Sequence, residues 1–317
     1  MATVVEGFVP SLVSVALSLL LFVPPHEARS VAAAIASVVN IFIVVIYIYL
    51  YITHRKDSFF RLKYLSLSQN NVEDMIHYID FTTSTNDDAR GAEYGHMDVI
   101  WAGRQSAGRG QRGHVWHSRE GDNLTFSVVL TPSFLPVVEQ FMLSEVVALA
   151  LCDALAEYGV DCRIKWTNDI YAGDGKIAGV LIEQSLSGDT IARTIVGIGL
   201  NVNQREFPDD LPNPTSMVVE RGRESDRREV LECFLKHLAA WYSRLESGDK
   251  GAVESAYRQR MYHLGEEHTY ALPSGERFRA TIRGVRPMGH LCLEHSDGVV
   301  REYAFKEVEF VLKARKE

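Results

Sequence analysis

The chain has 317 residues, of which 46% are apolar and 23% are charged, and its formal net charge is −8. This balance excludes a disordered, collagen-like or disulfide-stapled chain, and the acidic charge argues against a large nucleic-acid-binding surface. The average conceals an asymmetry, because residues 1–53 contain only three charged side chains, Glu6, Glu27 and Arg29. We therefore divide the sequence into an apolar leader and a charged body that is large enough for a substantial core and a small second domain.

The leader contains one segment that fits a membrane-spanning helix. Residues 31–52 carry no charged side chain, and a stretch of this length crosses the hydrocarbon core as a helix. Basic residues follow at 54–63 and, by the positive-inside rule, keep the body in the cytoplasm. A shorter apolar run at 8–24 provides a first span, so we expect membrane contact through residues 8–52, with the body tethered to the inner face of the cytoplasmic membrane.

A wrongly assigned start codon is the alternative explanation of the leader. Met75 lies just before the first motif of the body. A protein that begins there would be cytoplasmic and would contain every motif described below. The sequence leaves both interpretations open.

The cysteines are widely spaced and include no Cys-x-x-Cys pair; they are Cys152, Cys162, Cys233 and Cys292. This usage fits reduced, buried thiols in a cytosolic body. The spacing predicts neither a zinc site nor a disulfide framework.

After a polar linker at 54–74, hydrophobic periodicity predicts alternating strands and helices. The expected strands are 76–81, 99–102, 124–130, 163–166, 177–183 and 191–198, and the expected helices are 139–158, 227–246 and 252–262. A turn containing Gly173, Asp174 and Gly175 is expected to join the strands at 163–166 and 177–183. From His268 onward, short alternating strands with tight turns predict a small β-barrel.

Glycines and arginines alternate at 107–113, which reads Ala-Gly-Arg-Gly-Gln-Arg-Gly. The run matches G-x-G-x-x-G, but it leads into a strand rather than a helix, which argues against a dinucleotide fingerprint. No Gly-Lys-Ser/Thr follows, which excludes a Walker A loop. Glycines let the backbone approach a ligand closely, and arginines bind phosphate or carboxylate. A solvated surface loop is the alternative.

Three further motifs carry polar side chains at element boundaries. Residues 165–169 read Lys-Trp-Thr-Asn-Asp, and Lys176 opens a buried strand, where its ammonium group needs an anion. Another buried strand ends in Asn201 and Asn203, which strand alternation places on one face. Residues 84–86, Ser-Thr-Asn, precede a predicted helical turn. Taken singly, each motif also has a purely structural explanation. Lys176 is then an edge lysine that reaches solvent, the two asparagines close a turn, and residues 84–86 cap a helix.

Together and in this order, the motifs resemble the catalytic domain of biotin protein ligases, over about residues 76–317. The residues that carry the resemblance are Ser84-Thr85-Asn86, Gln105 to Trp116, Lys165 to Asp169, Lys176 to Glu183 and Gly197 to Asn203. The resemblance implies an α+β fold: a mixed-sheet catalytic domain of the class II synthetase/biotin ligase type at 75–264, then a small SH3-like β-barrel at 265–317. The leader (1–53) and the linker (54–74) lie outside it.

The activity implied by the resemblance is ATP-dependent attachment of biotin to a lysine of a biotin carboxyl carrier protein, through biotinyl-5′-AMP. Biotin and ATP are the expected substrates, and Mg²⁺ is the expected metal ion, with unknown ligands. We expect no nucleic-acid partner and leave a homodimer open. Two alternatives to biotin ligase activity are left open: a lipoate-protein ligase of the same fold, and a catalytically silent, membrane-tethered binding module.

The resemblance also implies residue roles. The resemblance implies catalytic roles for Lys176, Arg109 and Asp169. The implied biotin-binding residues are Ser84, Thr85, Asn86, Gln105, Gly108, Arg109, Gly110, Gln111 and Lys176, and the implied ATP-binding residues are Arg112, Trp116, Asn168, Lys176 and Asn201.

The sequence departs from the family pattern at three positions and in one domain. Thr167 stands where the family has proline, which we expect to affect loop stiffness more than chemistry. Gln111 and His114 occupy positions that are often basic, so we expect weaker retention of the adenylate. No helix-turn-helix precedes the body, and repressor activity is therefore not expected.

Overall fold

The computed structural model of the chain describes residues 72–113 and 115–312, with the backbone alone at Arg112. The predicted leader and most of the predicted linker therefore lie outside the described residues, as does His114. The last linker residues form a short helix, α4 (Val72–Met75). Within the described ranges, no helix combines the length and the apolar character that crossing a membrane requires.

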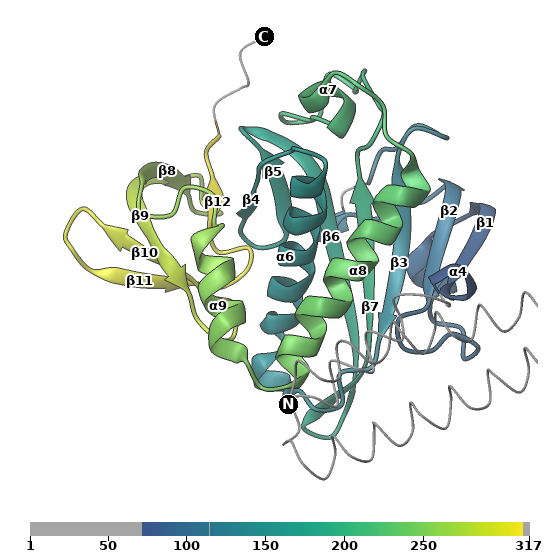
Figure 1. Ribbon diagram of the computed structural model, residues 1–317. Coiled ribbons are helices and arrows are strands. Elements are labelled where there is room, and N and C mark those ends of the chain that lie inside the picture. Colours follow the sequence, from purple (N-terminus) through teal and green to yellow (C-terminus); the bar gives the residue numbers. More distant parts are fainter. Residues whose placement is uncertain (1–71, 114, 313–317) are drawn as a thin grey trace, which may run out of the picture. The chain divides into compact units, whose positions relative to one another are not determined.

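Seven strands form a mixed sheet, the larger of the two sheets in Figure 1. Its order is β1-β2-β3-β7-β6-β5-β4; β1 pairs in parallel with β2, and the other neighbours in this sheet pair antiparallel. The bounds are Ile76–Thr82 (β1), Val99–Gln105 (β2), Leu124–Leu130 (β3), Cys162–Lys165 (β4), Asp169–Ala172 (β5), Gly175–Ser187 (β6) and Thr190–Leu200 (β7). Because antiparallel neighbours need only short connections, β4 to β7 follow one another as a meander.

The two faces of this sheet carry different side chains, because successive residues of a strand alternate between faces. On β7, Val196, Ile198 and Leu200 belong to the main hydrophobic core, whereas Gly197 and Gly199 lie on the opposite face. Strand β3 alternates in the same way. One face is therefore apolar and packed, and the other has room beside it.

Helices α6 (Phe141–Glu157) and α8 (Arg227–Glu246) cover the apolar face (Figure 1). Most of α6 is buried because it also packs against α9 (Lys250–Gln259) and β4. Helix α8 begins after Asp226, whose carboxylate accepts hydrogen bonds from the next backbone N–H groups and so caps the helix. Shorter helical segments are α5 (Thr85–Asp88), α7 (Met217–Arg221) and the 3-10 turns Gln111–Gly113 and Val137–Glu139.

The C-terminal part forms a second sheet, which is antiparallel throughout and has the order β11-β10-β9-β8-β12. Its strands are Glu267–Ala271 (β8), Arg277–Val285 (β9), Leu291–His295 (β10), Val300–Tyr303 (β11) and Glu309–Phe310 (β12). The Trp166 indole N–H donates to the carbonyl of Gly289 at 2.8 Å, which ties this sheet to the end of β4. The predicted α+β class, with short strands at the C-terminus, is confirmed.

Most predicted elements are present, and the predicted helix at 227–246 has the observed bounds. The prediction of a single turn between the strands at 163–166 and 177–183 is wrong. Strand β5 lies between them and pairs with both β4 and β6. At four residues it is too short to show a recognisable period, and it follows directly on the turn at 166–168.

The cysteines are free thiols, as predicted. Cys152, Cys162 and Cys292 are buried. Cys233 on α8 is only partly buried, which corrects the expectation that all the cysteines lie in the interior.

Candidate functional site

A cavity of about 870 Å³ opens on the glycine-bearing face of the seven-stranded sheet. The predicted site residues that line it are Ser84, Thr85, Asn86, Gln105, Arg109, Gly110, Gln111, Trp116, Asn168, Asp169, Lys176 and Asn201. Motifs that are far apart in the sequence therefore meet around one space.

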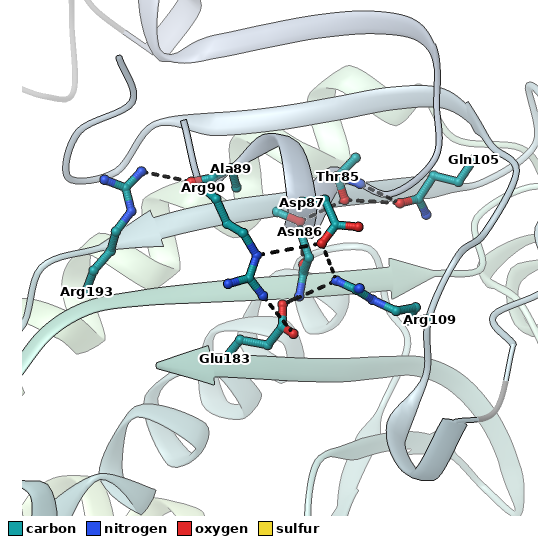
Figure 2. Close-up of polar contacts among 10 residues, drawn as sticks. Thr85, Asn86, Asp87, Ala89, Arg90, Gln105, Arg109, Glu183 and Arg193 are labelled. Carbon is teal, nitrogen blue, oxygen red and sulfur yellow. Dashed lines mark hydrogen bonds and ion pairs between the residues drawn. The ribbon is translucent and has the colours of Figure 1, made fainter. Parts of the chain in front are cut away.

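One end of the cavity holds a buried network of hydroxyl and amide groups around Asn86 (Figure 2). Gln105 Oε1 accepts a hydrogen bond from Thr85 N at 2.8 Å. Ser127 Oγ lies 2.7 Å from Thr85 Oγ1 and 2.6 Å from Asn86 Oδ1, and Asn86 Nδ2 donates to Glu183 Oε2 at 2.9 Å. Thr85, Asn86 and Ser127 are buried, and the hydrogen bonds fix the orientation of every member, as recognition of a polar ligand group requires.

Two glycines of β7 provide the space that the polar network and its neighbour occupy. A Cβ atom added to Gly197 would lie 2.2 Å from Asn86 Oδ1, and one added to Gly199 would lie 2.1 Å from Cε2 of the Trp116 indole. Gly199 and Gly197 are two residues apart, so both lie on the same face of β7. The Gly-x-Gly spacing therefore has a direct steric cause: side chains from the loop and from α5 rest on the strand backbone.

Two arginines and two carboxylates form a ring of ion pairs beside the polar end (Figure 2). Arg109 Nη2 lies 2.8 Å from Asp87 Oδ1 and 3.5 Å from Glu183 Oε2. Arg90 closes the ring, with Nη2 3.1 Å from Glu183 Oε1 and Nε 3.6 Å from Asp87 Oδ1. Because Glu183 also accepts from Asn86, the ring connects the loop arginine to the buried polar network.

A lysine and a carboxylate face each other at the other end of the cavity. Lys176 Nζ lies 2.7 Å from Asp169 Oδ1 and 5.7 Å from the centre of the Trp116 ring. Lys165 Nζ is 3.8 Å from Asp169 Oδ2, so two ammonium groups share this carboxylate. Nearby Tyr171 has its pKa raised by burial and by the charge of Asp169, so its phenol stays protonated. This end therefore presents two ammonium groups around one carboxylate, with an aromatic surface beside them.

Two lining asparagines bond to the backbone of neighbouring segments. The Asn168 amide donates to the carbonyl of Val180, and the peptide bond between Trp166 and Thr167, two residues earlier, is cis. Asn201 Nδ2 donates to the carbonyl of Thr215 at 2.9 Å. Asn201 Oδ1 and the Trp116 indole N–H are buried and have no hydrogen-bond partner among the described residues, which leaves one acceptor and one donor unmet beside the cavity.

Some predicted placements differ from the structure. Asn203 was expected to share a face with Asn201, but the chain leaves β7 after Leu200, and Asn203 bonds instead to the backbone of Ser225. Gly108 does not line the cavity and packs behind the backbone of Trp116, whose N–H its carbonyl accepts at 2.9 Å. The Arg112 side chain lies outside the described part of the structure.

The site also includes residues to which the sequence analysis assigned no role. Ser127 and Glu183 do not line the cavity itself but bond to Asn86, which does, and polar residues at alternate positions of the strand at 124–130 were the available signal for Ser127. Further lining comes from the loop after β7 and from the C-terminal segment: Phe207, Asp210, Leu211, Pro212, Pro214, Phe305, Val308, Glu309, Phe310 and Leu312. No local pattern placed these residues at the site, because tertiary packing brings them there.

Comparison with known proteins relates this geometry to one family. Residues 78–201 match the family model described as "Biotin/lipoate A/B protein ligase family". The biotin–[acetyl-CoA-carboxylase] ligase of Paracoccus denitrificans is 34% identical over 197 residues, which are 58% of this chain and 80% of that protein. The bifunctional ligase/repressor BirA of Bacillus subtilis is 32% identical over 226 residues, which are 65% of this chain. The chain spans only 64% of that relative's length.

A solved structure agrees with the sequence relatives. The biotin protein ligase from Aquifex aeolicus, in complex with biotin and ATP, superposes with a TM-score of 0.63 at 29% sequence identity, over 74% of this chain and 97% of that one. The match covers nearly the whole of that protein, so it includes more than the motifs. This chain therefore belongs to the biotin/lipoate A/B protein ligase family and, within it, to the biotin protein ligases.

Proposed function

We propose that this protein attaches biotin to a lysine of a carrier protein in two ATP-dependent steps through biotinyl-5′-AMP. The observation that carries the proposal is that one cavity joins a fixed polar end, around Asn86 and Gln105, to the end that presents ammonium groups, at Lys176. A ligand with a polar ring at one end and a phosphate at the other matches this arrangement. The Paracoccus and Aquifex relatives, named as biotin ligases, support the same substrate.

In the first step, the biotin carboxylate attacks the α-phosphorus of ATP, a P–O bond forms, and pyrophosphate leaves. Both reacting groups are anionic, so the chain must supply positive charge at the point of attack. Lys176 supplies it, and Asp169, at 2.7 Å, orients the ammonium group. The catalytic role proposed for Arg109 requires the loop to move, since contacts with Asp87 and Glu183 hold this arginine at the polar end in the present structure.

Adenine recognition is assigned to the groups beside Trp116. The indole offers a stacking surface and an unpaired N–H, and Asn201 offers an unpaired carbonyl oxygen. Buried polar atoms without partners favour a ligand that satisfies them. Asn168 belongs to the same end of the cavity.

In the second step, the amine of the carrier lysine attacks the carbonyl carbon of the mixed anhydride, and AMP leaves as the amide forms. The amine must arrive without its proton, and the adenylate must be kept from water until then. Described residues of the loop between Arg109 and Trp116 line the cavity on one side, and residues of the C-terminal segment at 305–312 line it on another. The proposed role of both segments is to exclude water.

Mg²⁺ is the ion expected to accompany the nucleotide, where it would neutralise phosphate charge. Among the described lining residues, Asp169 is already engaged by Lys176 and Lys165, whereas Asp210 and Glu309 are exposed. This donor set does not form a cage of its own, and Mg²⁺ commonly takes only one or two protein carboxylates and the phosphates of a substrate. We therefore assign the ion to the nucleotide phosphates, with Asp210 or Glu309 as its protein ligand.

Location and assembly remain predictions. The expected tether to the inner face of the cytoplasmic membrane depends on residues 8–52, which lie outside the described residues. Mass spectrometry of the native N-terminus, together with membrane fractionation, tests it. The homodimer is tested by sedimentation of the purified chain.

ATP–pyrophosphate exchange tests the first step and separates the competing activities. Purified protein is expected to catalyse exchange that requires biotin and is not supported by lipoate. Exchange that requires lipoate would assign the protein to the other branch of the family. No exchange with either acid would favour a catalytically silent binding module.

A further inference from the structure

A second group of side chains that could bind an ion lies away from the cavity, between the C-terminal end of α6 and the middle of α8. Glu157 is the last residue of α6, and Cys233 and His237 are four residues apart on α8, so they share one face of that helix. Their ligand atoms all lie within 4.8 Å of one another. We propose that Glu157, Cys233 and His237 form a binding site for Zn²⁺ that links α6 to α8.

One of the donor distances already fits a small tetrahedral ion, and a second is shorter than such an ion requires. With zinc–sulfur bonds of about 2.3 Å and bonds to nitrogen and oxygen of about 2.0 Å, tetrahedral donors lie about 3.3–3.6 Å apart. Cys233 Sγ lies 3.4 Å from Glu157 Oε2, and His237 Nε2 lies 2.7 Å from Oε1 of the same carboxylate. A small outward movement of the imidazole completes the fit, and three protein ligands leave the fourth position to water.

A second carboxylate lies on the Nδ1 side of the His237 imidazole. Asp153 lies one helical turn before Glu157, and its Oδ2 is 4.0 Å from Nδ1 of His237. Trp241 Nε1 and Arg260 Nη2 each contact the Asp153 carboxylate at 2.6 Å and fix its position. A carboxylate that accepts a hydrogen bond from Nδ1 is the usual support of a metal-bound histidine, because it leaves Nε2 for the ion. At 4.0 Å the Asp153 carboxylate makes no such bond, so this support requires the imidazole to move toward Asp153 when the ion binds.

One cation competes for the same carboxylate. Lys236 Nζ lies 3.2 Å from Glu157 Oε1, but the Lys236 side chain is 71% exposed and can turn into solvent when a divalent ion arrives. Burial and the hydrogen bond to Glu157 raise the pKa of the Cys233 thiol to about 11, so the thiol keeps its proton without metal. Zn²⁺ displaces that proton as the sulfur–metal bond forms.

No local spacing in the sequence predicts this site, because its ligands come from two helices. Cys233 and Glu157 are 76 residues apart in the sequence, and Cys233 is not part of a Cys-x-x-Cys pair. The helices pack closely against each other on the apolar face of the sheet, and only that packing brings the three ligands together. The proposed ion stabilises this helix layer and touches no residue of the cavity.

Titration with Co²⁺, a spectroscopic substitute for Zn²⁺, tests the proposal on the reduced, tag-free full chain. One equivalent is expected to produce the near-ultraviolet charge-transfer band of a cobalt–thiolate bond and the visible bands of tetrahedral cobalt. The variant C233S should lose the charge-transfer band, whereas the matched variant C292S, in the C-terminal sheet, should keep it. Asp153→Asn should keep the band and lower the Co²⁺ affinity roughly 10–100-fold.

Zn²⁺ supplies the second readout. It is expected to displace the Co²⁺ and to raise the thermal midpoint of the unmodified chain and of C292S, but not of C233S, since a ligand that binds only the folded state stabilises it. Serine keeps the size of cysteine at a partly exposed position, and circular dichroism checks that C233S is folded. No band in the unmodified chain, or a band that persists in C233S, would overturn the proposal.

Discussion

The two faces of the seven-stranded sheet come from the same strands and have opposite chemistry. The face under α6 and α8 carries large apolar side chains, such as Phe126 and Ile198, that are almost wholly buried. The other face carries Gly197 and Gly199, and loop and α5 side chains rest on their backbone. A strand that alternates in this way contributes to stability with one face and to ligand binding with the other. We therefore expect substitutions to separate into those that change the free energy of unfolding and those that change activity.

The largest effect is expected in the core of the helix-covered face. Leu149 on α6 is fully buried, so Leu149→Ala removes apolar contacts and leaves a cavity. The unfolding free energy should fall by about 2–5 kcal/mol, measured by chemical denaturation, with unchanged KM values in the protein that remains folded. Val138→Ala is the control, because that side chain is 59% exposed and its truncation should change stability by about 0.5 kcal/mol or less. A rise in the KM for ATP in Leu149→Ala would contradict the separation of the two faces.

On the cavity face, Lys176→Met should have the next largest effect. The substitution keeps most of the side-chain length but removes the charge beside Asp169. Adenylate formation should slow by roughly 10²–10³, the usual consequence of losing one group that stabilises transition-state charge. Biotin-dependent pyrophosphate exchange measures it.

The matched variant for this measurement is Lys236→Met, which removes a lysine outside the cavity. It should exchange at the unmodified rate, and both variants should retain the stability of the parent chain. Near-normal exchange by Lys176→Met would remove Lys176 from the proposed mechanism.

A buried carboxyl group makes the helix-covered face sensitive to pH. Burial, reinforced by Glu254, raises the pKa of Glu145 on α6 to about 8, well above its ordinary value near 4.5. The folded state therefore holds a proton that the unfolded state releases, and stability falls as the pH rises from about 4.5 through about 8. Glu145→Gln removes this dependence.

Denaturation of both proteins at pH 6 and pH 8 measures the difference. The stability of Glu145→Gln relative to the parent should increase by about 2 kcal/mol between these values, since each pKa unit corresponds to about 1.4 kcal/mol. A difference that does not change with pH would mean that Glu145 is ionised in the folded protein throughout this range.

The smallest effect is expected from one methyl group on the cavity face. A Cβ atom at Gly199 would overlap the Trp116 indole, so Gly199→Ala must displace the ring. Loss of a stacking contact worth about 1 kcal/mol should raise the KM for ATP several-fold with little change in stability. Gly251→Ala on α9, where a Cβ meets nothing within 4 Å, should leave the KM unchanged. Equal KM values for the two variants would show that Trp116 does not contact the nucleotide.

The sequence predicts those helices and strands whose hydrophobic period and caps lie in contiguous residues. Helix α8 has the predicted bounds because its apolar period and its cap at Asp226 are both local. Strand β5 was missed because four residues show no period, and Asn203 was misplaced because alternation was extended beyond the end of β7. Each error occurred where the strand pattern is too short or has stopped.

By itself, the sequence determined the α+β class, the family and most of the residues that line the cavity, because the motifs are short contiguous runs with a fixed order. Only the tertiary structure decided how those runs meet. Asn86 bonds to Ser127 across 41 residues and to Glu183 across 97, and these contacts depend on the pairing of β3, β7 and β6. The approach of Glu157 to Cys233 depends in the same way on the packing of α6 against α8. Strand register and helix packing are properties of the whole chain, so no local pattern records them.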